Sequence, residues 1–292
     1  MQLKIYNNIT ECGRIWNQFS PNRNLFDIWE FRQCFYNRED HKPHFIVGKQ
    51  NSEITGFIPL YYIKSLGKYT YFGGWFPERN SFFMKNKKML SMMLEHCPSN
   101  TSVEGISPEE RAYYDFSEDE YTYFIDLKKY DYSFEKYFGS FDKKKQKNFK
   151  RDLNSIPKHN VHLNRLKDFK RLMELNLRQF EDDSIYADKN IKNSLQKMVR
   201  LAHRKGLLQM LSIEINKKIE AVDVGISLGE RYYVVTGSSN NHKIPNIGKL
   251  LTTLDIKNAI SRGARYVDFL ASSDYWKMQW SFDKAMMFKF DK

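Results

Sequence analysis

Short alternating runs of apolar and polar residues recur along the chain and predict two similar sets of strands. Residues 44–63, HFIVGKQNSEITGFIPLYYI, give a strand, a polar turn and a second strand, and residues 208–228, LQMLSIEINKKIEAVDVGISL, repeat that pattern. Alternation interrupted by Asn, Gly, Ser and Lys is typical of β-hairpins. An aromatic strand follows each hairpin, at residues 68–75 and 231–239. The order β-β-β therefore occurs twice.

A helix and a further short strand complete each half. Residues 85–96 and 246–263 carry apolar side chains at helical spacing. The order β-β-β-α-β thus occurs twice with little sequence identity, which indicates two copies of one architecture. We therefore predict a mixed α+β fold with two tandem domains, residues 1–132 and 133–292. Each domain is expected to pack helices on a mostly antiparallel sheet.

The join between the halves lies between a closing strand at residues 121–127 and a basic segment at residues 141–153. Two further helices are predicted in the second half, at residues 167–180 and 189–206. The second of these ends at Gly206, because glycine readily adopts the left-handed conformation that follows many helices.

Composition adds a preference for anionic partners. The 292 residues include 47 Lys and Arg against 35 Asp and Glu, for a formal net charge of +12. Such a charge favours nucleic acid, phosphorylated intermediates, a coenzyme diphosphate or an anionic membrane surface. A lysine-rich and asparagine-rich genome would produce the same charge, so the charge alone does not select among these partners.

The apolar runs and the cysteines indicate a cytoplasmic protein. No apolar run approaches the roughly 18 residues of a membrane span. The N-terminal residues 1–19 are polar throughout and lack the apolar core of a signal peptide. Three widely separated cysteines, Cys12, Cys34 and Cys97, suit free thiols in a reducing compartment.

Motifs for metal and hydrolase chemistry are absent from the sequence. The seven histidines are scattered, and neither CxxC nor HExxH occurs. The GxSxG elbow of many serine hydrolases is missing as well. We therefore predict no metal site. A hydrolytic triad stays possible in principle, because its members need not be close in sequence.

The segment TGSSNNHKIPNIG, residues 236–248, joins an aromatic strand to an apolar helix. Backbone N–H groups at a helix N-terminus attract anions, and glycine lets a ligand approach the backbone. Gly237, Ser238, Gly248 and the following Lys249 are therefore candidates for binding the phosphates of a donor. An ordinary strand-to-helix loop is the alternative. A nucleotide-hydrolase P-loop is excluded, because no Gly-Lys-Ser/Thr ends the segment.

The run KKKQKNFKR, residues 143–151, allows two interpretations. Several cations on successive helical turns could clamp phosphates, which makes Lys147, Asn148, Lys150 and Arg151 candidates for binding a phosphorylated ligand or acceptor. A solvated helix face is the alternative.

The stretch DFLASSDYWKMQW, residues 268–280, places a carboxylate and a cation near the end of a strand. Asp268 lies in a core strand, where an ionised side chain is costly unless it is paired. Lys277 is flanked by Trp276 and Trp280, and a cation there could stabilise negative charge on a carbonyl oxygen during acyl transfer. The alternative is a lysine that extends to solvent and makes a cation–π contact.

Residues 247–280 resemble the last part of the Fem-type and BioF2-like acyltransferases of the GNAT superfamily. That family has a Gly, an apolar helix, a second Gly, a strand ending in Asp-Phe, a small turn, and Tyr/Phe-Lys with a following aromatic residue. KNFKRDL, residues 147–153, resembles the Arg-Asn-x-Arg-Arg segment that opens the family's second domain. The positions that carry the resemblance are Pro59-Leu60, Lys147, Asn148, Lys150, Arg151, Gly248, Gly263, Asp268-Phe269, Tyr275, Trp276-Lys277 and Trp280.

The resemblance implies twin GNAT-like domains with a cleft between them. It also implies transfer of an acyl or aminoacyl group to an amine. In the Fem-type branch the donor is aminoacyl-tRNA and the acceptor a cell-wall peptide precursor; in the BioF2-like branch the donor is acyl-CoA. The donor would be a co-substrate, so no tightly bound cofactor is expected. An amine-bearing acceptor, which a phosphorylated cell-envelope precursor would satisfy, is the second expected partner.

The resemblance, together with the acyl-transfer hypothesis that follows from it, suggests residue roles. Lys277 would lie near the reacting carbonyl and stabilise the oxyanion or the leaving group. Trp276 would contact the donor, and backbone donors of residues 231–239 would complete the anion pocket. Asp268, Tyr275 and Asp223 are candidates for the base that the amine needs.

Two departures from the family pattern bear on the donor and on the fold of the site. The coenzyme A signature is incomplete in HKIPNIGKL, which keeps only Gly248, and this favours aminoacyl-tRNA slightly. ASS, residues 271–273, replaces the glycine that often follows Asp-Phe. A non-catalytic twin domain that binds RNA or another anionic polymer is the alternative function.

Overall fold

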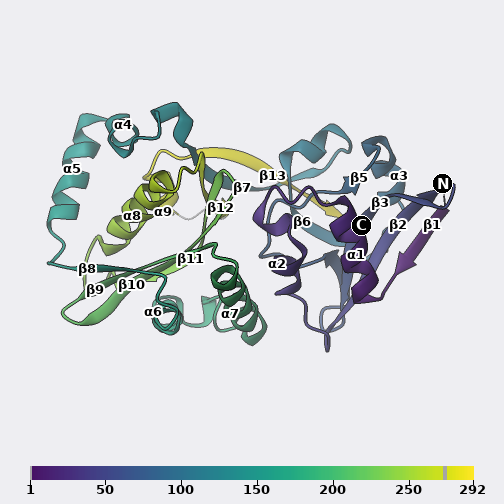
Figure 1. Cartoon of the computed structure of the whole chain (residues 1–292), viewed down its shortest axis with the longest axis horizontal. Helices are drawn as coiled ribbons and strands as arrows, with labels where there is room; N and C mark the ends of the chain where they lie inside the picture. Colours follow the sequence, from purple (N-terminus) through teal and green to yellow (C-terminus); the bar gives the residue numbers. More distant parts are fainter. Residues whose placement is uncertain (1, 272–274) are drawn as a thin grey trace. The chain divides into compact units, whose positions relative to one another are not determined.

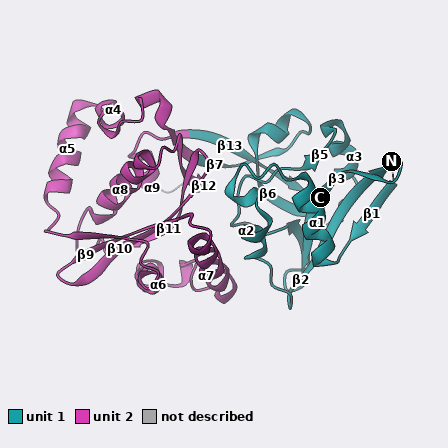
Figure 2. Cartoon of the chain, in the orientation of Figure 1, with its two compact units in different colours: residues 1–122, 271–273, 284–292 teal, residues 123–270, 274–283 magenta. Residues whose placement is uncertain are grey.

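The computed structural model describes residues 2–271 and 275–292. The chain forms two compact units, coloured separately in Figure 2. The first unit holds residues 1–122, 271–273 and 284–292, and the second holds residues 123–270 and 274–283. Strands β7 (Ser117–Asp126) and β13 (Asp283–Asp291) each begin in one unit and end in the other. The predicted domain limits at residues 132 and 133 stay a prediction.

An antiparallel sheet with an aromatic core forms the first unit. Its strand order is β1-β2-β3-β4, and β5 pairs with β3. Trp16 lies at the centre of the core, with the rings of Phe45, Phe57 and Phe83 around it. The strands are β1 (Gln2–Tyr6), β2 (His41–Gln50), β3 (Glu53–Ile63), β4 (Lys68–Tyr71), β5 (Phe83–Met84) and β6 (Ser102–Ile106), and the helices are α1 (Ile9–Phe19), α2 (Trp29–Gln33) and α3 (Leu90–Leu94).

Two features of the first unit differ from the sequence pattern. The helix predicted over residues 85–96 is shorter, with a 3-10 turn at Lys87–Met89 followed by α3. Strand β6, next in the chain, pairs antiparallel with β13 from the far end of the chain, with Ile106 opposite Phe288. Hydrophobic alternation predicts that a strand exists, but it does not identify a partner so distant in sequence.

The second unit packs helices on both faces of a mixed sheet, as Figure 1 shows for α8 on one face and α6 and α7 on the other. Its strand order is β7-β12-β11-β10-β9-β8, in which β11 and β12 run parallel while β8, β9, β10 and β11 pair antiparallel. The elements are α4 (Phe134–Gly139), α5 (Lys143–Asn154), β8 (Asn160–Leu163), α6 (Asp168–Phe180), α7 (Lys189–Arg204), β9 (Leu208–Ile215), β10 (Lys218–Leu228), β11 (Arg231–Ser239), α8 (Ile247–Ser261), β12 (Tyr266–Ala271) and α9 (Tyr275–Met278).

The two hairpins predicted to match do so in detail. Asn51-Ser52 and Asn216-Lys217 form the two turns, and all four residues have positive φ, as two-residue hairpin turns require. Each hairpin then carries a bulge three residues after its turn. Thr55 in β3 and Glu220 in β10 fall outside the paired register. The predicted α+β fold with two similar, mostly antiparallel halves is confirmed.

Candidate functional site

Strands β11 and β12 pair over only part of their length. The parallel register joins Arg231 to Tyr266, Tyr232 to Val267 and Tyr233 to Asp268. Across the residues that the structure describes, the pairing ends there, although β11 continues to Ser239 and β12 to Ala271. The edge of β11 after Tyr233 is therefore open on the β12 side. Backbone donors at such an opening can bind a carbonyl oxygen.

Lys277 places a buried ammonium at the end of β12. Its side chain is only 3% exposed. The Nζ atom donates to the backbone oxygens of Phe269, at 2.9 Å, and Leu270, at 3.3 Å. It also lies 5.4 Å from the ring centroid of Tyr123 and 5.9 Å from that of Trp276. The cation–π contact expected from the sequence is present, but the lysine does not extend to solvent.

Asp268 is fully buried and holds the end of β12. Its Oδ2 atom lies 2.9 Å from Nη1 of Arg231, and its Oδ1 atom accepts the N–H of Leu270 at 3.0 Å. Leu270 has a φ of 59°, an uncommon conformation for a non-glycine residue, and the Asp268 contact stabilises it. The partner that the sequence required for this carboxylate is thus Arg231. A role for Asp268 as a base stays a prediction.

The remaining members of the terminal stretch differ in their surroundings. Trp276 is partly exposed and packs edge-on against Phe269, at 6.0 Å between ring centroids. Tyr275 begins α9, but its side chain lies outside the described part of the structure, as do Ser272 and Ser273 of the turn. The predicted role of Tyr275 therefore stays a prediction.

The predicted donor loop is packed against itself. The N–H of Gly248 donates to Oδ1 of Asn241, at 3.2 Å, and a Cβ at Gly248 would lie 3.0 Å from Oγ of Ser239. Ser238 is buried and donates to Oε1 of Gln179 on α6, at 3.3 Å. Gly248 thus contacts its own loop, while the Ser238 side chain contacts α6. These two residues, both predicted to bind the donor, therefore make their contacts with different parts of the protein.

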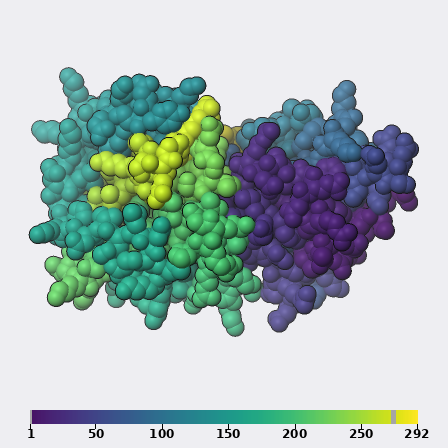
Figure 3. Space-filling model, viewed as in Figure 1, coloured from purple at the N-terminus to yellow at the C-terminus, as the bar shows by residue number. Residues whose placement is uncertain are grey.

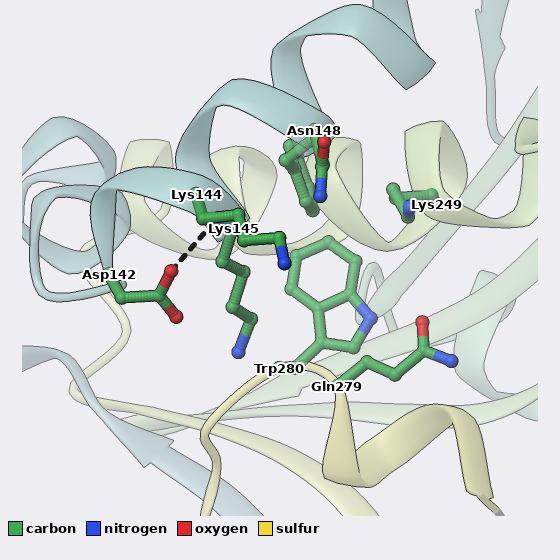
Figure 4. Close-up of a pocket in the computed structure, with 8 residues that line it drawn as sticks. Asp142, Lys144, Lys145, Asn148, Lys249, Gln279 and Trp280 are labelled. Carbon is green, nitrogen blue, oxygen red and sulfur yellow. Dashed lines mark hydrogen bonds between the residues drawn. The ribbon is translucent and has the colours of Figure 1, made fainter.

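A pocket of about 320 Å³ lies where α5, the start of α8 and the end of α9 meet. Figure 4 shows Gln279 and Trp280 extending toward the α5 residues, with Lys249 on the other side. In Figure 3 the yellow C-terminal segment packs against the teal segment that holds α4 and α5. The residues that line the pocket are Asp142, Lys144, Lys145, Asn148, Phe149, Lys249, Gln279 and Trp280.

The pocket combines an aromatic wall with an excess of positive charge. Trp280 packs edge-on against Phe149, at 5.1 Å between centroids. Lys249 lies 2.6 Å from Oδ2 of Asp152, and Lys145 donates to Oγ of Ser281 at 2.9 Å. Partial burial lowers the pKa of Lys145. Three lysines against one lining aspartate make this an anion-binding environment.

Only part of the predicted phosphate-binding set lines this pocket. Asn148 does, and so does Lys249 from the predicted donor set. Lys147, Lys150 and Arg151 are exposed on α5, with Nη2 of Arg151 3.2 Å from Oδ1 of Asp152. Lys144 and Lys145, which also line the pocket, belong to the same basic run of residues 143–151. Helical spacing alone does not tell which cations of that run face a neighbouring helix.

A pair of buried carboxyl groups lies between β10 and α8. Asp223 is 7% exposed and Asp255 is 0% exposed. The Tyr232 hydroxyl donates to Oδ1 of Asp255 at 2.8 Å. Burial raises the pKa of Asp255 to about 7, and burial together with the charge of Asp255 raises the pKa of Asp223 well above its usual value. Gly237 makes room for the pair, because a Cβ there would lie 2.6 Å from Cγ of Asp223.

The sequence named Asp223 as a candidate base but missed its neighbours. Asp255 lies in LLTTLDIKNAI, where a single acidic residue among apolar ones was a signal that such a partner could exist. Among the described residues, His, Cys, Asp and Glu side chains form no group of three that could hold a metal ion. In the same part of the chain, none of the helices has the length and apolar content to cross a membrane.

Comparison with known proteins relates this geometry to a family. Residues 143–278 match the family described as an acetyltransferase (GNAT) domain. No curated protein sequence matches the chain. The family match covers β11, α8 and β12 together with Lys277, the elements that form the site.

Three solved structures share the fold over nearly the whole chain. FemX is 12% identical with a TM-score of 0.60, covering 99% of this chain and 96% of its own. A tandem GNAT protein from the clavulanic acid biosynthesis pathway is 8% identical, with a TM-score of 0.55 and coverage of 99% and 98%. L-PGS from Bacillus licheniformis is 10% identical, with a TM-score of 0.57 and coverage of 96% and 90%. The resemblance is therefore confirmed: residues 143–278 match the GNAT acetyltransferase domain, and the chain as a whole shares its fold with FemX and with a tandem GNAT protein.

Proposed function

We propose that the chain is an N-acyltransferase that moves an acyl or aminoacyl group from an activated donor to an amine. The observation that carries the proposal is the buried ammonium of Lys277 at the end of β12, beside the open edge of β11. The GNAT family supports acyl transfer as the reaction type. A cell-envelope precursor, which can be phosphorylated, is the acceptor class we propose.

The proposed chemistry follows from where negative charge develops. The amine attacks the donor carbonyl, and the oxygen of that carbonyl becomes an oxyanion. A cation fixed in a water-poor environment stabilises such charge far better than one in bulk water, because it needs no reorganisation. Two backbone oxygens hold the Nζ atom of Lys277 in place, which supports this role. We propose backbone N–H groups of β11 as the second source of stabilisation.

The pocket beside α5 supports an anionic donor. Lys144, Lys145 and Lys249 can neutralise phosphates, and the Trp280 wall can pack against an aromatic base. We propose aminoacyl-tRNA as the donor and acyl-CoA as its alternative. The bond from the Gly248 N–H to Asn241 occupies a backbone donor that a coenzyme diphosphate would otherwise use, and this favours tRNA.

Single-turnover transfer by Lys277→Met and Lys277→Arg tests the proposal. Methionine keeps the length and packing but removes the charge, so the transfer rate should fall on the order of a hundredfold or more. Arginine keeps the charge and should retain more activity than methionine. Donors would be charged tRNA and acetyl-CoA, with thermal unfolding as the control for folding. Transfer by Lys277→Met at the wild-type rate would show that this role is wrong.

A second function, RNA binding without catalysis, is favoured by the exposed cations Lys147, Lys150 and Arg151 on α5. Thermal stabilisation by uncharged tRNA, with no transfer to a panel of amines, would support it. Competition by free coenzyme A against a labelled thioester would instead support acyl-CoA as the donor. Binding of tRNA should weaken steeply with salt, because each neutralised phosphate releases counterions.

A further inference from the structure

The carboxyl pair Asp223–Asp255 is buried without a cation. Among the described residues, no lysine, arginine or histidine forms an ion pair with either side chain. Two buried carboxylates in contact cannot both stay ionised, since burial and their mutual repulsion both oppose the second charge. The pair therefore keeps one proton at neutral pH, and its second carboxyl gains or loses a proton near pH 7.

The hydrogen bonds indicate where that proton lies. Oδ1 of Asp255 accepts from the Tyr232 hydroxyl, which in turn accepts from Nδ2 of Asn258 at 3.3 Å. Oδ1 of Asp223 accepts the Val224 N–H at 3.1 Å. Oδ2 of Asp255 is buried with no other described partner, so it is the natural acceptor for a proton carried by Asp223.

The other titratable groups around the pair are tyrosines. Tyr232 of β11 faces Asp255 directly, and its pKa is raised, chiefly by burial. Tyr186 approaches from the other face of the sheet, where its hydroxyl lies 2.9 Å from Oγ1 of Thr236. Burial raises its pKa, and the charge of Asp223 adds to that effect. Both phenols stay neutral near pH 7, so the pair itself is the group that gains or loses a proton.

The fold does not require an acid at this position. Asp223 lies six residues after the turn residue Lys217, and the matching position in the first hairpin is Ile58, six residues after Ser52. Both hairpins carry their bulge at the same distance from the turn, so counting residues from the turn gives equivalent positions in the two strands. Ile58 is fully buried in an apolar core. An acid in the second unit thus costs stability that the same architecture avoids elsewhere, which points to a chemical task.

Gly237 brings the pair to the open part of β11. It lies opposite Asp223 in the β10–β11 register, four residues beyond the last residue of β11 that pairs with β12. The absence of a side chain lets the Asp223 carboxyl lie directly over the Gly237 backbone, as the 2.6 Å from a Cβ to Cγ shows. The register also shifts beside Val235, which loosens the ladder at this level.

We propose that the Asp223–Asp255 pair accepts the proton of the attacking amine, with Asp223 as the catalytic residue that meets the substrate and Asp255 as its positioning residue. This inference rests on the proposed function. The nitrogen lone pair forms the C–N bond to the donor carbonyl. The nitrogen proton passes to Asp223 as the proton that Asp223 carries moves to Oδ2 of Asp255, and the pair becomes neutral. As the C–O or C–S bond breaks, a proton returns to the leaving oxygen or sulfur. The pair ends with one proton, as it began.

The first experiment counts the proton without needing activity. In protein labelled with ¹³C at the aspartate carboxyl carbons, the signals of this pair would be followed from pH 4 to 9 in wild type, Asp223→Asn and Asp255→Asn. One carboxyl of the pair should stay protonated at pH 7, and its partner should titrate near neutrality. Two ionised carboxylates at pH 7 would overturn the proposal. Glu220→Gln is the matched control, because Glu220 is a buried carboxyl on the same strand that Lys243 and Arg171 pair.

The second experiment follows the pH dependence of single-turnover transfer. The wild-type rate should fall below about pH 7, as the pair becomes fully protonated, which gives the pH–rate profile an acidic limb. Asp223→Asn should lack this acidic limb and should transfer at least tenfold more slowly than wild type. Asp223→Ile, which copies the first unit, should fold at least as stably yet lose transfer equally. Glu220→Gln should keep the limb. An unchanged limb and rate in Asp223→Asn would refute the proton-acceptor role. If wild type transfers nothing from any donor, that role falls with the proposed function, and the carboxyl titration shows separately whether the pair shares a proton.

Discussion

The contact between Gly237 and Asp223 gives a prediction that depends on geometry alone. In Gly237→Ala, the new Cβ would lie 2.6 Å from Cγ of Asp223 and 2.9 Å from its Oδ2 atom. Atoms at such distances must separate by about an ångström, because ordinary contacts begin near 3.5 Å. Asp223 cannot move freely, since Asp255 and the Val224 N–H hold it.

Overpacking of this kind typically costs about 1–3 kcal/mol. The cost works against the modest gain that a glycine-to-alanine change gives where space allows. With a shift of about 2–4 °C for each kcal/mol, thermal unfolding of Gly237→Ala should begin several degrees lower than in wild type. Gly139→Ala is the control: Gly139 ends α4, has no atom within 4 Å of its would-be Cβ, and should tolerate alanine.

A double-mutant cycle assigns the loss to this contact. Asp223→Ala removes the atoms that the new Cβ would meet, so Gly237→Ala should cost little in the Asp223→Ala background. The coupling energy between the two sites should therefore reach about 1 kcal/mol or more. Chemical denaturation of the four proteins at one pH measures it. Additive effects within about 0.3 kcal/mol, or a fully stable Gly237→Ala, would refute the close packing and with it the access argument for the carboxyl pair.

Three further results are expected. Replacing both Lys144 and Lys145 by Gln should weaken tRNA binding and reduce the slope of log K against log salt by about one to two, measured by filter binding across a salt series. Because the native pKa of Asp255 is raised to about 7 from 3.8, the folded state binds the proton more tightly, so the free energy of unfolding should fall as pH rises between about 4 and 7. Asp255→Asn should make that fall smaller in urea titrations at several pH values. Arg231→Met removes the Arg231 cation from beside the buried Asp268 carboxylate, and should destabilise the protein by about 3–5 kcal/mol in the same assay, more than Asp268→Asn.

The strands of both hairpins and the ends of two helices could be predicted from the sequence, because each depends on residues close together in the chain. Alternation predicted the strands of both hairpins, and glycines predicted helix ends: Gly206 and Gly263 follow α7 and α8 with φ values of 69° and 70°. The pairing of β13 with β6 did not follow, since Phe290 and Val103 are brought together only by the tertiary fold.

The candidate site was predictable only where one residue carried the signal. Lys277 was found because a lysine between tryptophans after a strand is unusual. The structure shows that this lysine is buried. Asp255 was missed because an isolated aspartate on a helix is ordinarily a solvent-facing residue. Helix α8 is buried on several sides, which no 3.6-residue period reveals. The orientation of Ser238 toward α6 likewise depends on strand register, which a bulge can reverse.

The two hairpins separate what the architecture needs from what the chemistry needs. Both keep the same turn conformation and the same bulge offset, so these features serve folding. At one matched buried position the two differ in chemistry, because Ile58 fills an apolar core where Asp223 meets Asp255. A polar group placed where its own twin shows that an apolar one fits lowers stability and improves no packing. The asymmetry therefore favours the second unit as the one that performs proton transfer, and it does so without reference to any relative of the protein.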